Sequence, residues 1–227
     1  MPEKYLAFLF DAYGTLFDVH SVVVRAGADI GGNLEALSGL WRQKQLEFTW
    51  LRALMDRYED FWHVTEAALR TALAQLQIEA GEHQIRQLLD SYLAPAVFPD
   101  AIVALDALCD DPLAILSNGT PKMLEAAVGN NGLEAYFTNV ISVDQVKTYK
   151  PSPRVYQLGL DALHLPAEEI LFVSSNAWDA AGAKAFGYSV CWCNRSGHPM
   201  DLLGFAPDIV VSSLDQIPQP PPARSLQ

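Results

Sequence analysis

Short apolar runs that alternate with helical segments are the feature that most constrains the fold of this 227-residue chain. Strands of this kind are buried on both faces and need helical crossovers, so they build a parallel sheet covered by helices. The pattern predicts an α/β protein with a doubly wound, Rossmann-like parallel sheet. The expected strands are Tyr5 to Phe10, Leu113 to Leu116, Val140 to Val143, Ile170 to Val173, Ser189 to Cys193 and Asp208 to Val211.

Capping residues mark the helices between these strands. Thr120-Pro121 and Ser152-Pro153 each place an N-cap residue before a proline in the first helical turn. Gly187 stands where a helix that begins near Ala177 should end. These boundaries supply the crossovers that a parallel sheet requires.

Residues 19–97 break the alternation, because apolar residues recur there at helical rather than strand spacing. Three or four amphipathic helices are expected, inserted after the first strand and above the carboxyl edge of the sheet, where such folds hold their ligands. We predict a helical cap subdomain at 19–97, a core domain formed by 1–18 and 98–218, and a disordered, proline-rich tail at 219–227. The apolar positions in the insertion are Leu37, Leu40, Trp41, Phe48, Leu51, Met55, Tyr58, Leu69, Leu73, Leu76, Ile85, Leu88, Leu89 and Tyr92.

Composition excludes several classes of partner. Twenty-seven acidic and fifteen basic residues give a net charge of -12, which disfavours nucleic acid and anionic membranes. An anionic substrate would therefore need a locally positive site. Half of the residues are hydrophobic, yet no apolar run is long enough to cross a bilayer, and the first residues lack a signal-peptide pattern. The odd number of cysteines, three, indicates reduced thiols. We expect a soluble, cytoplasmic protein.

Polar residues follow four of the expected strands. They are Asp11, the pair Ser117-Asn118, Lys150 before Pro151, and the segment Ser174 to Asp179. An Asp at a strand end often only caps the next element, and a lysine is commonly solvated. However, the carboxyl ends of parallel strands meet at one edge, so these groups are expected to converge there.

The local strings in these segments resemble the haloacid dehalogenase superfamily. More narrowly, the chain resembles the 2-haloacid dehalogenases that invert configuration, from about Leu6 to Leu214. The resemblance implies hydrolysis of a carbon–halogen bond in a small 2-haloacid by water, no cofactor, and a homodimer. The matching strings are Asp11-Ala12-Tyr13-Gly14-Thr15-Leu16, Trp41-Arg42-Gln43-Lys44-Gln45-Leu46, Tyr149-Lys150-Pro151 and Ser174-Ser175-Asn176-Ala177-Trp178-Asp179.

Tyr13 favours halide over phosphate chemistry. Phosphatases of this superfamily carry a second Asp at that position, which protonates a leaving alkoxide. A halide leaves without a proton, so Asp11 followed two residues later by Tyr13 suits carbon–halogen cleavage.

The resemblance implies a catalytic role for seven residues. Asp11 is the nucleophile that forms an ester, and Lys150 offsets and orients its carboxylate. Asp179 orients or activates the water that attacks the ester. Ser174 and Asn176 add hydrogen bonds, and Thr15 and Tyr156 support the network.

The resemblance also implies residues that bind the substrate. Arg42, Asn118 and the ring edge of Phe61 hold the halide, and Ser117 with nearby backbone amides holds the carboxylate. Tyr13, Leu46, Phe61 and Trp178 form an apolar wall. An exposed Arg42 and aromatic rings that belong to the ordinary core are the plain alternatives.

Two rival functions remain open. Ser175 and Asp179 also fit the loose metal motif of the phosphatase branch, so a magnesium-dependent phosphatase or phosphonatase-like enzyme is the first rival. Asn176 and Tyr13 argue against a metal, and we expect none. A non-catalytic binding module that has kept the fold is the second rival.

Overall fold

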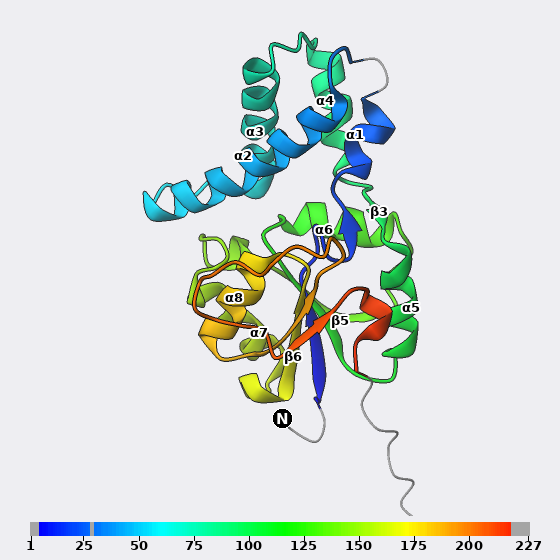
Figure 1. Ribbon diagram of the computed structural model, residues 1–227, viewed down its shortest axis with the longest axis vertical. Coiled ribbons are helices and arrows are strands. Elements are labelled where there is room, and N and C mark those ends of the chain that lie inside the picture. Colours follow the sequence, from blue (N-terminus) through cyan, green and yellow to red (C-terminus); the bar gives the residue numbers. More distant parts are fainter. Residues whose placement is uncertain (1–4, 28–29, 219–227) are drawn as a thin grey trace, which may run out of the picture.

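The computed structural model describes residues 5–27 and 30–218, and within them six strands form one parallel sheet (Figure 1). Its strand order is β5-β4-β1-β6-β7-β8, with parallel pairing throughout. The predicted doubly wound α/β fold is confirmed. The strands are β1 (Ala7–Phe10), β4 (Leu113–Ser117), β5 (Phe137–Ser142), β6 (Ile170–Ser174), β7 (Ser189–Cys193) and β8 (Ile209–Val211).

Helices connect the strands and cover both faces of the sheet. They are α5 (Pro99–Ala107), α6 (Pro121–Gly129), α7 (Pro153–Leu163) and α8 (Ala177–Phe186). From β1 the chain continues through β4 to β5, and it then crosses over to β6 on the other side of β1. The strand order therefore reverses beside β1, and the carboxyl end of β1 is the place where a doubly wound sheet binds its ligand.

The expected helix boundaries are found. The Thr120 hydroxyl accepts a hydrogen bond from the Met123 backbone N–H and caps α6. Helix α7 begins at Pro153 after Ser152, and α8 ends before Gly187, which has a φ of 123°. The N-cap residues Thr120 and Ser152 mark where loops at the carboxyl edge end, and Gly187 begins the turn from α8 to the start of β7 at the opposite edge.

The third expected strand was wrong in its bounds. We expected Val140 to Val143, but β5 spans Phe137–Ser142 and Val143 begins a short 3-10 helix. The reason is that β5 is an edge strand whose first four side chains alternate between half-buried and exposed, so that part of the strand carries no continuous apolar run. Lys150 therefore does not follow a strand directly. A loop of residues 146–152 carries it back to the sheet edge.

The inserted stretch is helical, and among its described residues lie four helices (Figure 1). Four of the expected apolar positions lie at or beyond the helix ends. Met55, Leu76 and Tyr92 are the C-cap residues of α2, α3 and α4, and Tyr58 lies between α2 and α3. An antiparallel pair of short strands, β2 (Phe17–Asp18) and β3 (Ala96–Val97), links the insertion to the sheet. The helices are α1 (Ser21–Ala26), α2 (Leu34–Leu54), α3 (Phe61–Gln75) and α4 (Glu82–Ser91).

One buried hydrophobic core runs from the sheet into the inserted helices. In the described part of the chain no helix has the length and apolar character needed to cross a bilayer. The tail predicted to be disordered, 219–227, lies outside the described residues. The fold therefore places the insertion above the carboxyl end of β1, where Asp11 follows (Figure 1).

Candidate active site

Asp11 lies directly after β1, and the turn that follows it is set by Gly14. The Asp11 backbone N–H donates to the Val173 carbonyl, which ties the residue to β6. Gly14 has a φ of +94°, a conformation that a side chain disfavours, and its N–H donates to Phe17 O at 2.7 Å. This turn sends the chain into the insertion while the Asp11 side chain stays at the sheet edge.

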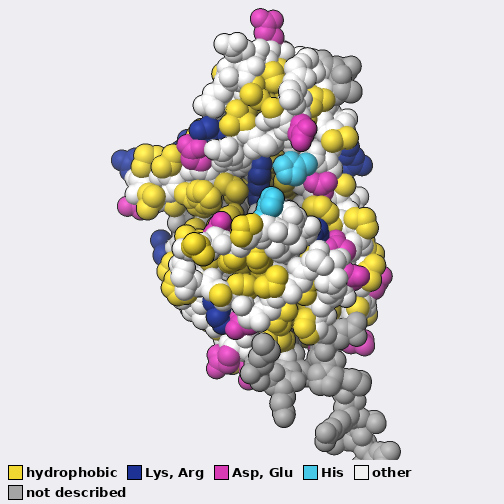
Figure 2. All heavy atoms as spheres, in the orientation of Figure 1, with side chains coloured by type: hydrophobic (Ala, Val, Ile, Leu, Met, Phe, Trp, Pro, Cys, Tyr) yellow, Lys and Arg dark blue, Asp and Glu magenta, His cyan; other side chains and the backbone are white. Residues whose placement is uncertain are grey.

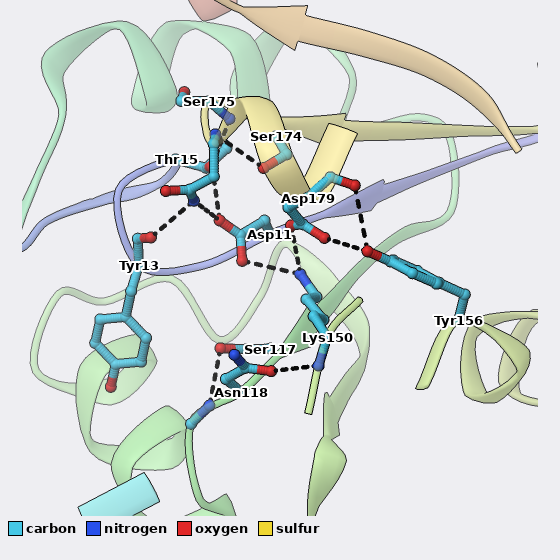
Figure 3. Close-up of polar contacts among 12 residues, drawn as sticks. Asp11, Tyr13, Thr15, Ser117, Asn118, Lys150, Tyr156, Ser174, Ser175 and Asp179 are labelled. Atoms are coloured by element: carbon cyan, nitrogen blue, oxygen red, sulfur yellow. Dashed lines mark hydrogen bonds and ion pairs between the residues drawn. The ribbon is translucent and has the colours of Figure 1, made fainter. Parts of the chain in front are cut away.

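Lys150 lies between two buried carboxylates (Figure 3). Its Nζ is 2.9 Å from Asp11 Oδ1 and 2.8 Å from Asp179 Oδ2. Tyr156 donates its hydroxyl proton to Asp179 Oδ1 at 2.8 Å. The Lys150 side chain is only 1% exposed, so the alternative of a solvated lysine is wrong.

For both Lys150 and Asp179, burial and the neighbouring opposite charge shift the pKa in opposite directions. Burial lowers the pKa of Lys150, but the Asp11 and Asp179 carboxylates more than offset it and hold the pKa above its usual value. Burial raises the pKa of Asp179, Lys150 opposes the shift, and the charge of Asp11 adds to it. Lys150 therefore stays protonated, whereas Asp179 holds a proton more readily than an exposed aspartate.

The second oxygen of Asp11 accepts two neutral hydrogen bonds. Thr15 Oγ1 donates to Asp11 Oδ2 at 2.9 Å, and Asn176 Nδ2 donates to it at 2.8 Å. Ser174 lies beside them without bonding to Asp11 or Lys150. Its hydroxyl instead accepts the Asn176 backbone N–H at 3.1 Å, because it turns back on the loop that starts α8. Its predicted hydrogen bond therefore acts on Asn176.

Arg42 reaches from α2 of the insertion to the loop of the nucleophile. Its Nη2 donates to the Tyr13 carbonyl at 3.1 Å, and its Nη1 donates to Gln45 Oε1 at 2.7 Å. Gln45 is fully buried and also donates to the Thr65 hydroxyl. Gln45 was missed from the sequence, although its spacing of three residues from Arg42 places both on one helix face. Gln45 and the Tyr13 carbonyl thus hold the Arg42 guanidinium above the sheet edge.

Ser117 ends β4, the neighbour of β1, and Asn118 follows it. The Asn118 side-chain oxygen accepts the Lys150 backbone N–H at 3.1 Å, which fixes the loop that carries the lysine. Ser117 Oγ accepts the Gly119 N–H at 3.1 Å and is buried. Both predicted residues thus lie at the edge, close to the nucleophile's loop (Figure 3).

The expected apolar wall is only partly assembled. The Tyr13 and Phe61 rings are 6.0 Å apart, and Tyr92, which was not among the residues predicted for this wall, lies 5.9 Å from Tyr13. Trp178 instead pairs with Trp50 at 5.4 Å. Both tryptophans line a cavity of about 700 Å³ that reaches Lys150. Leu46 is half-buried on α2, four residues from Arg42.

This arrangement suits nucleophilic attack by a carboxylate. Asp11 is oriented by a cation on one oxygen and by two neutral donors on the other, and a second cation lies above the loop. The Lys150 ammonium lies between one oxygen of Asp11 and one oxygen of Asp179. The site therefore carries its own positive charge.

A family profile described as haloacid dehalogenase-like hydrolase matches residues 5–187. The chain belongs to this hydrolase family. The predicted resemblance to this family is thereby confirmed, and a comparison with individual proteins indicates the branch of the family to which the chain is similar.

This hydrolase is similar to proteins named for haloacid chemistry. It is 48% identical to an (S)-2-haloacid dehalogenase of Pseudomonas sp. strain YL over 207 residues, covering 90% of this chain and 89% of the relative. It is 46% identical to haloacetate dehalogenase H-2 of Moraxella sp. strain B, covering 95% and 97%. Among solved structures, an L-2-haloacid dehalogenase from Xanthobacter autotrophicus with covalently bound chloropropionic acid aligns with a TM-score of 0.86, at 42% identity over 93% of this chain and 96% of that one.

Replacing Lys150 by methionine should expose the repulsion between Asp11 and Asp179. We expect Lys150→Met to lower the free energy of unfolding by about 3–5 kcal/mol at pH 7.5, because two buried carboxylates lose their cation. The loss should be smaller at pH 5.5. In the variant the two carboxyl groups have a folded-state pKa above the unfolded value, so their protonation adds stability as the pH falls. Urea unfolding at both pH values measures it.

Lys184→Met is the matched control. Lys184 pairs with Asp208 at 2.7 Å, but their side chains are 33% and 27% exposed. Its loss should cost about 0–1 kcal/mol at either pH. A Lys150→Met variant as stable as this control would contradict the electrostatic account of the site.

Proposed function

We propose that this hydrolase is an (S)-2-haloacid dehalogenase, which converts short (S)-2-haloalkanoic acids to (R)-2-hydroxy acids through an ester on Asp11. The contact that carries the proposal is the buried ion pair between Lys150 and Asp11 at the carboxyl end of β1. It presents a charged, oriented carboxylate at the ligand-binding edge of the sheet. The names of the relatives support the same substrate class.

In the first step Asp11 attacks the carbon that bears the halogen. A bond forms between a carboxylate oxygen and C2 while the carbon–halogen bond breaks on the opposite face, and the halide leaves with the bonding electrons. The configuration at C2 is inverted. Arg42, Asn118 and the edge of Phe61 are proposed to hold the halide, and their positions around the Tyr13 turn and the end of β4 support this.

In the second step water attacks the acyl carbon of the Asp11 ester. The acyl C–O bond breaks, and the hydroxy acid leaves with its inverted centre intact. Thr15 and Asn176, which donate to one oxygen of Asp11, are placed to stabilise charge there. We assign to Asp179 the proton that the attacking water loses, and Asp179 then gives it to the departing alkoxide oxygen. The restored Asp11 carboxyl loses its own proton to the solvent. The raised pKa of Asp179 suits this exchange, and Tyr156 and Lys150 hold Asp179 in place.

The substrate is an anion, and the chain carries a net charge of -12. Local positive charge comes from Arg42 and Lys150. Ser117 and the backbone amides at the end of β4 are proposed to receive the substrate carboxylate, because the loop leads into the N-terminus of α6. Tyr13, Leu46, Phe61 and Trp178 are proposed to enclose the remaining alkyl part.

A panel of halide-release assays tests the proposal against a magnesium-dependent phosphatase. Chloride or bromide should be released from the (S)-2-halopropionates in excess chelator, and chiral analysis should give the (R)-hydroxy acid. Halide release that needs magnesium, retention of configuration, or metal-dependent release of phosphate from small esters would contradict the proposal. The (R)-substrates serve as the control and should react far more slowly.

Heavy-oxygen water tests the nucleophile. With enzyme in excess over substrate, one turnover should place the label in Asp11 and leave the product unlabelled, because water attacks the ester. Label in the first product would mean that water attacked the substrate. Mass spectrometry of the peptide and of the acid measures both.

Asp11→Asn completes the label experiment. It should lower kcat by more than about 10³-fold while the fold is retained, and Asp161→Asn, at an exposed position of α7, should leave kcat unchanged. Loss of the fold in Asp11→Asn would instead favour a structural role for the residue.

We further propose that residues 19–97 form a cap on the core of 1–18 and 98–218, and that the protein is a cytoplasmic homodimer. The unpaired state of Cys109, Cys191 and Cys193 fits a reducing compartment. The end of α2 projects from the molecule (Figure 1) and carries hydrophobic side chains (Figure 2). Exposed there are Leu51, Leu54 and Met55.

Light scattering tests the homodimer. We expect twice the 24.9 kDa mass of one chain for the native protein, and about one chain mass for Leu54→Glu, because a charge should break an apolar contact. The control is Val24→Glu, since Val24 on α1 is similarly exposed, at 78% against 82% for Leu54. A monomeric native protein would contradict the proposal.

A further inference from the structure

Arg195 joins segments of the chain that are far apart in the sequence, and the residue lies outside every string quoted above. It follows β7, near the carboxyl edge of the sheet. Its Nη1 donates to Ser175 Oγ at 2.9 Å, and its Nη2 donates to the Thr15 carbonyl at 2.9 Å. The Gly14 carbonyl lies 3.4 Å from Nη1. One guanidinium therefore binds the loop that carries Asp11 and the neighbouring loop after β6.

Asp100, in the first turn of α5, fixes this guanidinium. The pair is bidentate, with Arg195 Nε 2.9 Å from Asp100 Oδ2 and Nη2 3.0 Å from Oδ1. Burial raises the pKa of Asp100, but Arg195 and the Leu214 N–H outweigh it and hold the pKa below its usual value. The Phe98 ring packs against the guanidinium at 4.1 Å. Asp100 thus stays charged and anchors Arg195 to the core.

The groups that Arg195 binds lead to the nucleophile in two hydrogen bonds. The Ser175 N–H donates to Thr15 Oγ1 at 2.8 Å, and Thr15 Oγ1 donates to Asp11 Oδ2 at 2.9 Å. A shift of the Thr15 or Ser175 backbone would therefore rotate the hydrogen bond that sets the carboxylate plane. Misplacement of this kind, away from the reacting atoms, is known to reduce rates by up to about 10²-fold.

We propose that Arg195 is a positioning residue for the dehalogenation: it holds Thr15 and Ser175 so that the Asp11 carboxylate faces the substrate carbon. The role rests on the proposed function. Within the described residues its hydrogen bonds go to the two loops and to Asp100, and none goes to Asp11 itself. Arg195 should therefore affect the chemical steps more than the binding of the substrate.

Steady-state kinetics of Arg195→Met with (S)-2-chloropropionate test the role. We expect kcat to fall by about 10- to 100-fold, with little change in KM. The Arg195 side chain is 23% exposed, so added guanidinium chloride at low, non-denaturing concentration should enter the vacated site. It should restore part of kcat, because Asp100, Ser175 and the carbonyls remain, whereas potassium chloride at equal ionic strength should not.

Asp100→Asn is the second variant, and it tests the positioning role of Arg195 if Arg195→Met does not fold. It keeps the arginine but weakens its anchor, so kcat should fall by less than in Arg195→Met while KM stays near the native value. Arg70→Met is the matched control, because Arg70 on α3 is exposed and its bidentate hydrogen bonds go to Glu82 of α4. Its kcat should equal the native value.

The outcomes separate the two proposals. Native enzyme that releases no halide overturns the proposed function, and the positioning role with it. Native activity with an unchanged kcat in the folded variants overturns the positioning role alone. A lower kcat that guanidinium does not restore, accompanied by a lower Tm, would show that Arg195 only stabilises the fold.

Discussion

The site depends on one buried cation placed between two carboxylates. Lys150, Asp11 and Asp179 are nearly inaccessible to water, and each would be costly to bury without the others. They come from the end of β1, the loop after β5 and the first turn of α8. The parallel sheet, with its strand order reversed beside β1, brings these segments to one point. The fold and the charge arrangement therefore support each other.

The inserted helices complete the site from the opposite side. The Gly14 turn directs the chain away from the sheet only three residues after Asp11, and Arg42 of α2 bonds back to that turn through the Tyr13 carbonyl. A chain with a large negative charge thus places cations from both parts around one carboxylate. Long-range attraction of an anion would be weak here, so binding has to come from local contacts.

Much of the fold and of the site could be predicted from the sequence, and the limits have physical causes. Strands buried on both faces, such as β4 and β6, can be recognised in the sequence as apolar runs. The first residues of the edge strand β5 alternate between half-buried and exposed, and the predicted bounds of that strand were wrong. The segments that hold Asp11 and Asn176 were placed at one edge because strand ends converge there, and the roles of the two residues were implied by the family resemblance. Gln45 and Arg195 were not found, because their roles arise from tertiary hydrogen bonds that no local pattern reports.

Tyr13 shows how one position can separate two chemistries. Its carbonyl accepts hydrogen bonds from Arg42 and Asn176, while its ring points away from the Asp11 carboxylate (Figure 3). Burial raises the pKa of its hydroxyl, which leaves that hydroxyl a poor proton donor as well as a distant one. An alkoxide leaving group would find no acid at this position, but a halide needs none. The backbone of Tyr13 therefore contacts the groups around Asp11, whereas its ring lies against Phe61 and Tyr92 and its buried hydroxyl has no hydrogen-bond partner within the described residues.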